Sequence, residues 1–125
     1  MGGWGSRPWQ NDEAADWFHE FWKPRDIAFL INEINNFDEK QERYDSFRAA
    51  SYVLQAFGSP YMWPAQHREI LKELLDKSID VLEKMINPPS DDWGFLDMWG
   101  NNQEVIDSVR DQINQLKLRR SEIVF

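Results

Sequence analysis

The chain has 125 residues, of which 42% are hydrophobic, and this composition excludes an intrinsically disordered protein. Its formal net charge of −8 disfavours binding to nucleic acid or to an anionic membrane surface and favours a basic partner. There is no cysteine, which excludes disulfides and thiolate chemistry and suits a reducing compartment. No apolar run approaches membrane-spanning length. We therefore expect one cytoplasmic domain over residues 1–125, with no membrane contact.

The first ten residues combine three glycines and a proline with two tryptophans. Glycine and proline disfavour a helix here. Trp4 and Trp9 would lose the benefit of burying two large side chains if they stayed in water. We expect residues 1–10 to form an ordered strap whose two indoles are mostly buried against the helices.

Apolar side chains at helical spacing predict two helices after the strap. Asn11 or Asp12 can cap the first helix, and Pro24 stops it. The second helix is expected to begin near Asp26 and to end at Asn35 and Asn36. We expect a core residue in the middle of the first helix, at Trp17.

The boundaries of two further helices are also visible in the sequence. Asp38 and Gln41 resemble a capping box for the third helix, whose apolar side runs from Tyr44 to Phe57. Gly58 is expected to end this helix in the left-handed conformation. For the last helix, residue 101 or 102, both asparagine, is the predicted cap.

Residues 63–87 are predicted to form the central helix. Pro64 lies in its first turn and prolines at 88 and 89 follow its end. At about 100° per residue, one half of the helix is apolar. The apolar residues are Ile70, Leu71, Leu74, Leu75, Ile79, Val81, Leu82, Met85 and Ile86. We therefore expect an all-α fold, with five main helices around this one and the strap packed across them.

The side of the central helix opposite its apolar half carries a stripe of five carboxylates. They are Glu69, Glu73, Asp76, Asp80 and Glu83. One interpretation is a solvated face with weak i, i+4 pairs, such as Glu73 with Lys77 and Asp80 with Lys84. The other is a surface that binds a basic groove, such as a nuclease active site.

Two further acidic segments are candidates for partner binding. The last helix carries a second row made of Glu104, Asp107 and Asp111. The turn-rich stretch 90–100 is expected to contain a short helical turn, and it begins with Asp91, Asp92 and Trp93. These three combine charge with an anchor residue, as interfaces do, although a packed tryptophan beside a solvated turn explains them too.

Motifs for catalysis or for cofactor binding are missing from the sequence. His19 and His67 belong to no metal-ligand pair of recognised spacing. The glycines of the strap lack the residues of a phosphate-binding loop, and no nucleophile elbow is present. We expect no catalytic residue, no metal and no cofactor, and hence a protein that is not an enzyme.

Residues 3–17 read Gly-Trp-Gly-Ser-Arg-Pro-Trp-Gln-Asn-Asp-Glu-Ala-Ala-Asp-Trp, and this opening resembles that of the bacterial DUF4259 family. The alanine-rich residues 49–56 are similar to the family's third helix, and residues 97–99 look like the segment before its last helix. Arg7 stands where the family usually has glycine, and Trp9 where it usually has phenylalanine. The resemblance implies a small bacterial helical domain and brings no catalytic residues.

Small acidic bacterial proteins of this kind resemble immunity proteins, which neutralise toxins. We therefore expect a non-catalytic domain whose acidic helical face binds a basic toxin domain, such as a nuclease. The alternative is a structural or regulatory subunit that self-associates through its aromatic residues, and an enzyme of unknown type comes third. The sequence leaves the oligomeric state open.

Overall fold

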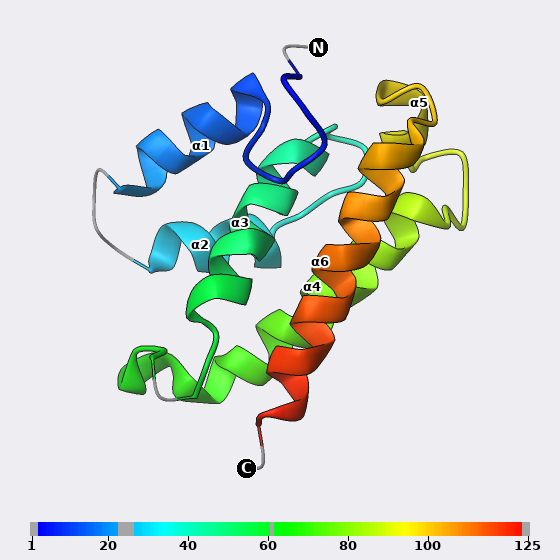
Figure 1. Ribbon diagram of the computed structural model, residues 1–125. Helices are drawn as coiled ribbons and strands as arrows, with labels where there is room; N and C mark the ends of the chain where they lie inside the picture. The colour runs from blue at the N-terminus through cyan, green and yellow to red at the C-terminus, as the bar shows by residue number, and fades with distance from the viewer. Residues whose placement is uncertain (1–2, 23–26, 61, 124–125) are drawn as a thin grey trace.

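The computed structural model describes residues 3–22, 27–60 and 62–123, and over these residues the chain forms helices without a β-strand (Figure 1). The expected all-α fold is thereby confirmed. In chain order the elements are α1 (Asp12–Trp22), α2 (Ala28–Asn35), α3 (Tyr44–Phe57), the 3-10 helix η1 (Ala65–His67), α4 (Arg68–Ile86), α5 (Phe95–Met98) and α6 (Gln103–Ser121).

Asparagine side chains cap the first and the last helix, as predicted. The Asn11 side chain accepts a hydrogen bond from Ala14 N at 2.7 Å, which satisfies one of the free N–H groups of α1. At α6, the Asn102 side chain accepts from Glu104 N at 2.9 Å and from Val105 N at 3.2 Å. The predicted stop at residue 24 and the start of the second helix near residue 26 lie outside the described residues.

The predicted capping box of the third helix is wrong. Asp38 lies in a turn, where its backbone carbonyl accepts from Gln41 N at 3.0 Å, and α3 begins only at Tyr44. The first turn of α3 is instead capped from another helix. The carboxylate of Glu13 on α1 accepts hydrogen bonds from the backbone N–H and the hydroxyl of Ser46. A tertiary contact therefore takes the place of the local cap.

The C-terminal end of α3 also differs from the prediction. Gly58 has φ −80°, so it does not adopt the left-handed conformation. A Cβ atom at this position would lie 2.3 Å from the backbone carbonyl oxygen of Leu54, so glycine is needed for close approach. Phe57, which was expected on the buried side, is exposed because it lies at the end of the helix, beyond the last covered turn.

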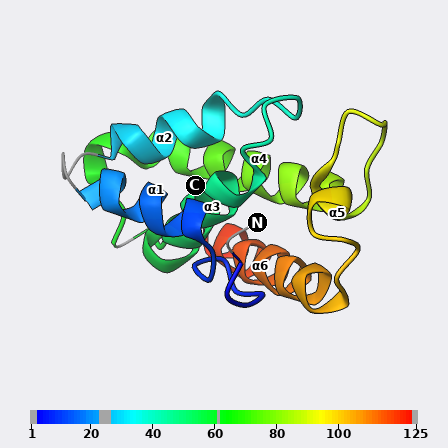
Figure 2. The ribbon, with the colours of Figure 1, turned by 90° about the horizontal axis from the view of Figure 1, so that it is seen from above.

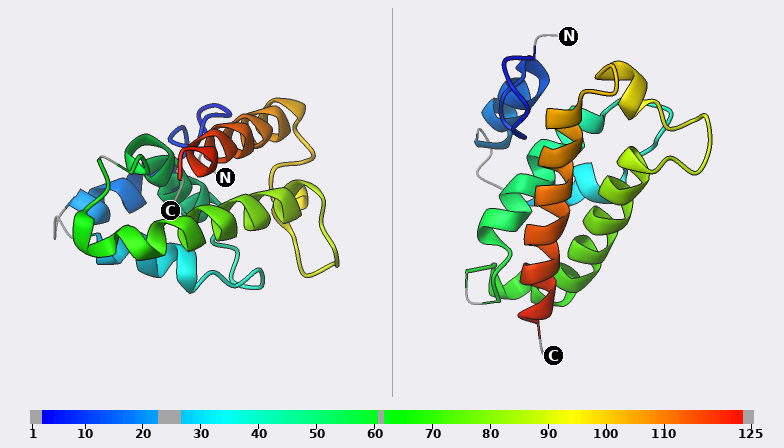
Figure 3. Two further views of the ribbon diagram at one scale, coloured as in Figure 1. Left: turned by 90° about the horizontal axis from the view of Figure 1, so that it is seen from below. Right: turned by 45° about the vertical axis from the view of Figure 1, so that its right-hand side comes forward.

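Helix α3 is the most enclosed element. Every residue from 44 to 51 is buried, and the helix packs against α1, α2, α4 and α6 (Figure 2). The segment predicted as one central helix, 63–87, is a 3-10 turn followed by α4. Helices α4 and α6 run antiparallel and side by side along most of their length (Figures 1 and 3). Ser78 of α4 is fully buried.

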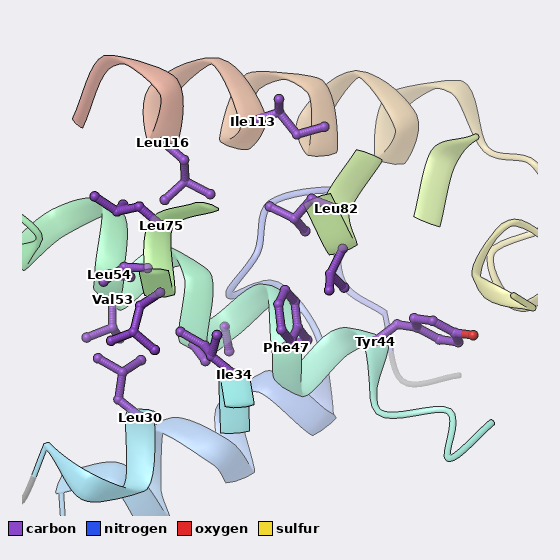
Figure 4. Close-up of a cluster of buried hydrophobic side chains, with 14 of the residues drawn as sticks. Leu30, Ile34, Tyr44, Phe47, Val53, Leu54, Leu75, Leu82, Ile113 and Leu116 are labelled. Carbon is purple, nitrogen blue, oxygen red and sulfur yellow. The ribbon is translucent and has the colours of Figure 1, made fainter. Parts of the chain in front are cut away.

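The hydrophobic core lies where α2, α3, α4 and α6 meet (Figure 4). Leu30 and Ile34 of α2 point toward Phe47 and Leu54 of α3, and leucines of α4 and α6 close the core from the other side. Trp17 of α1 is only 3% exposed, which confirms its prediction as a core residue.

The strap is ordered, as predicted, and lies between α1 and α6 (Figures 1 and 2). Trp4 N donates to the carbonyl oxygen of Gln10 at 2.8 Å, which closes the strap on itself. The predicted burial of its indoles is wrong, because Trp4 is 60% exposed and Trp9 is 41% exposed. The strap is held instead by its backbone and by Pro8, which is buried.

Candidate functional site

The acidic stripe of α4 is partly neutralised by basic residues of α6. Asp76 Oδ1 accepts from Arg120 Nε at 2.7 Å, and the Glu83 carboxylate lies 3.0 Å from Lys117 Nζ. These partners come from the last turns of α6, which the antiparallel packing brings beside α4. The pairing reduces the negative potential that the stripe presents to another molecule.

The rest of the stripe divides between one paired and two unpaired carboxylates. Asp80 lies 3.0 Å from Lys84 Nζ, as its spacing suggested. Lys77 donates instead to the backbone carbonyl oxygen of Asn35 at 2.8 Å, so it does not pair with Glu73. Within the described part of the chain, Glu69 and Glu73 are the members of the stripe that make no ion pair.

The second acidic row is exposed on α6. Glu104, Asp107 and Asp111 all lie at the surface. Asp107 accepts from Gln103 Nε2 at 2.9 Å and lies 3.7 Å from Arg110, so its charge is partly balanced within the helix. The three carboxylates of this row are therefore separate surface charges, and they do not line one pocket together.

The loop candidate is divided between solvent and core. Asp91 and Asp92 are exposed. Trp93 is half-buried, with its ring centroid 5.8 Å from that of Phe37 and 6.3 Å from that of Tyr44. These contacts fix the loop to α3 and give Trp93 a structural role.

A groove of about 550 Å³ along α1 brings acidic and aromatic side chains together, and we call it the α1 groove. Asp12, Asp16 and Glu20 are exposed on its rim at i, i+4 and i+8 spacing. Trp17 and Phe29 are among its apolar lining residues. Their spacing along the sequence places these three carboxylates on one side of the helix.

The aromatic part of the α1 groove is rigid. The ring of Trp17 stacks against Phe21 and Phe29, with centroid distances of 5.3 Å and 5.2 Å. Its indole Nε1 donates to Glu33 Oε1 at 3.1 Å, which fixes the ring from the α2 side. A partner side chain would therefore meet a preformed surface.

One guanidinium already lines the α1 groove. Arg43 donates from Nη2 to Glu33 Oε1 at 2.6 Å and from Nε to Glu33 Oε2 at 3.1 Å. These hydrogen bonds raise the pKa of Arg43 above its usual value. Because Glu33 balances the charge of Arg43, the carboxylates of Asp12 and Asp16 on the rim keep their negative potential.

An exposed tryptophan stands at the N-terminal end of the α1 groove. Trp4 Nε1 donates to Asp12 Oδ1 at 2.8 Å, so this indole is held in place while most of its surface faces solvent. Tryptophans in such positions are enriched among the residues that contribute most to binding energy.

A buried polar cluster lies between α3 and α6, and the sequence analysis did not find it. Arg48 is fully buried and donates from Nε to Gln112 Oε1 at 2.8 Å and from Nη2 to Ser108 Oγ at 3.0 Å. Burial lowers the pKa of Arg48 to about 10. The available signal was the position of Arg48 between Tyr44 and Ser51, on the buried side of its helix.

Asp45 is a further buried polar residue of α3. Its carboxylate accepts a hydrogen bond from Trp99 Nε1 at 2.9 Å. Burial raises the pKa of Asp45 above the usual range of an aspartate, and the nearby Glu13 acts in the same direction. The cluster is enclosed by the fold, so its residues act on stability.

In residues 3–22, 27–60 and 62–123, no three histidine or acidic side chains are placed to hold a metal ion together. His19 lies at the surface of α1 and belongs to no such group among these residues. Nor does any described helix combine the length and the apolar character needed to cross a membrane.

The described residues form an all-α domain with an acidic groove along α1. The family model of a domain of unknown function (DUF4259) matches residues 2–123. The chain therefore belongs to the DUF4259 family, which confirms the family resemblance over nearly its whole length. No curated protein and no solved structure matches the chain.

Proposed function

We propose that this domain is a bacterial immunity protein, which binds and neutralises a basic toxin domain through the α1 groove. The observation that carries the proposal is the rim of Asp12, Asp16 and Glu20 above a rigid aromatic surface. The groove combines three exposed carboxylates with a hollow, and the exposed Trp4 is hydrogen-bonded to Asp12 at its N-terminal end.

The chemistry of the groove suits a lysine or arginine side chain. Such a side chain would place its apolar stem against the half-buried Phe29, whose ring Trp17 supports from below, and its charged end among the carboxylates of the rim. Arg43 lines the same groove and is paired with Glu33, so a guanidinium is already accommodated at its edge. Trp4 would add an apolar contact at one end.

The charge of the whole chain supports fast association. A net charge of −8 attracts a basic partner over a distance, and this steering raises the association rate more than the final affinity. The α4 stripe would contribute to the long-range field, although Asp76 and Glu83 are already paired within the chain.

A pair of matched charge reversals tests the proposal. Asp16→Lys changes the rim of the α1 groove, and Glu73→Lys makes the same change of charge on α4, where the carboxylate is exposed and unpaired. Tagged wild-type protein and both variants are expressed in the native host, and the polypeptides that co-purify in stoichiometric amounts are identified and quantified.

We expect one basic polypeptide to co-purify with the wild type and with the Glu73→Lys variant. Asp16→Lys should reduce its recovery by at least about tenfold. The same polypeptide should be toxic when it is expressed without the domain. Equal recovery with all three proteins, or a co-purifying polypeptide that is not toxic, would contradict the proposal.

A further inference from the structure

A second surface runs along the seam between α3 and α6, beside the strap. It consists of two adjoining pockets of about 300 Å³ and 330 Å³ that share Tyr52, Gln55 and Gln115 as a common wall. We call the first the strap pocket, because Arg7, Pro8 and Trp9 of the strap line it. We call the second the end pocket, and it is lined by Leu118, Arg119 and Glu122.

The two pockets carry complementary groups. In the strap pocket, the rings of Trp9 and Tyr52 lie 5.0 Å apart and leave Trp9 41% exposed, which provides an apolar site. In the end pocket, Leu118 is 60% exposed. One pocket thus offers an aromatic site and the other an aliphatic side chain that projects into solvent.

The positions of these groups along α6 fit a twofold arrangement. We infer that the seam binds a second copy of the chain, with the two α6 helices antiparallel and the twofold axis at Gln115. In that register, residue 118 of one copy lies opposite residue 112 of the other. Residue 112 is in the α6 wall of the strap pocket, so Leu118 would enter the pocket of the partner copy and contact Trp9 and Tyr52 there.

The charges match in the same register. Arg119 lies opposite residue 111, which places it beside Asp111 of the partner subunit. Glu122 lies opposite residue 108, which is in the strap pocket together with the partner's Arg7. Within one chain, Arg119 Nη1 lies 3.1 Å from Glu122 Oε1 and Arg119 Nε donates to the carbonyl oxygen of Gln55 at 2.7 Å, so both charged groups would meet the second copy while they share these contacts. Each copy would therefore form the same two ion pairs.

This match is the reason to infer a second copy as the occupant. An interface with twofold symmetry requires a patch that is complementary to itself, so that each contact occurs twice. With the axis at Gln115, the contacts of Leu118, Arg119 and Glu122 with the strap pocket of the other copy would each occur twice. The seam shares no lining residue with the α1 groove, so this inference is independent of the proposed function.

The first test measures the mass of the full chain against concentration by sedimentation equilibrium. We expect a monomer–dimer equilibrium that Leu118→Glu shifts by at least about tenfold toward the monomer, because a carboxylate cannot enter the aromatic site. Met62→Glu is the matched control, since Met62 is similarly exposed and lies outside both pockets. A wild type that stays monomeric at millimolar concentration would overturn the inference, as would equal effects of the two substitutions.

The second test checks the register by charge exchange. Arg7→Glu and Glu122→Arg should each weaken the dimer by placing like charges opposite each other. The double variant restores an ion pair of opposite polarity, so it should dimerise more tightly than either single variant. Circular dichroism and melting curves verify that each variant is folded. Additive weakening in the double variant would overturn the proposed axis at Gln115.

Discussion

The guanidinium of Arg48 donates a hydrogen bond from Nη2 to the backbone carbonyl oxygen of Ser6, at 3.1 Å. This bond ties the strap to the most enclosed helix of the fold. It also explains how the strap is ordered although its tryptophans are exposed, because the buried charge needs acceptors that α3 and α6 supply only in part.

Arg48→Met should therefore destabilise the protein and loosen the strap. The substitution keeps an apolar stem of similar length but leaves Gln112 Oε1 and the Ser6 carbonyl oxygen without their donor. We expect the free energy of unfolding to fall by about 3 kcal/mol in urea titrations. Amide exchange at Trp4 should become faster. Arg110→Met, on the surface, is the control and should stay within about 0.5 kcal/mol of wild type. Slow exchange at Trp4 in the Arg48 variant would show that the strap is held by other contacts.

Trp17 and Trp4 should differ sharply in their contribution to stability. Trp17→Ala removes a ring that is 3% exposed and stacked between two phenylalanines, so it should cost roughly 3–5 kcal/mol. Trp4→Ala removes a ring that is mainly solvated and should cost less than about 1 kcal/mol. Chemical unfolding followed by circular dichroism measures both. Equal losses would mean that Trp4 is buried in solution.

Asp45→Asn should make the stability of the protein less dependent on pH. Because burial raises the pKa of Asp45 in the folded state, the folded protein binds more protons than the unfolded chain between the two pKa values. Its contribution to stability is therefore lost as the pH rises through this window, which begins at the ordinary pKa of about 4. Asparagine keeps an acceptor for Trp99 and has no charge, so the variant should gain stability relative to wild type as the pH rises from 4 to 7. Urea titrations across this range measure the difference, with the exposed Asp92→Asn as control. A variant less stable than wild type at pH 7 would show that Trp99 and Arg48 favour the charged carboxylate enough to outweigh its burial.

The glycine after α3 gives a test of close packing. Gly58→Ala places a Cβ atom 2.3 Å from the carbonyl oxygen of Leu54, so the backbone must shift and stability should fall by about 1–3 kcal/mol. Gly94→Ala adds a Cβ with no neighbouring atom within 4 Å, at a φ of −96°, and should leave stability unchanged or slightly higher. In melting curves, the melting temperature should fall for Gly58→Ala and should stay the same or rise slightly for Gly94→Ala. A Gly58 variant that melts like wild type would show that the end of α3 can relax.

Sequence patterns that depend on neighbouring residues predicted the helices. They failed for caps and buried contacts that depend on residues far away in the chain. Helical spacing and the caps at Asn11 and Asn102 were sufficient to place α1 and α6, because both depend on neighbours in the chain. The cap of α3 was mispredicted because it comes from Glu13, 33 residues away. The burial of Arg48 was not foreseen because its partners on α6 are 60 and 64 residues away.

The same limitation applies to the candidate sites. The α4 stripe looked uncompensated because Lys117 and Arg120 approach it only after α4 and α6 pack together. The α1 groove was overlooked because its second wall comes from Phe29 and Arg43, on other elements. Helical periodicity shows which side chains share a face, and tertiary packing decides whether that face becomes part of a groove.

The association rate of the co-purified partner, measured against ionic strength, tests the binding role of the α1 groove most directly. For the wild type we predict a rate that falls steeply as salt increases, because steering by the acidic rim is screened. Asp16→Lys should lower the rate at low salt and flatten the slope, whereas Glu73→Lys should have a clearly smaller effect on both. If Asp16→Lys leaves the rate and the slope at their wild-type values while Glu73→Lys lowers them, the partner binds the α4 stripe and the α1 groove is not the site.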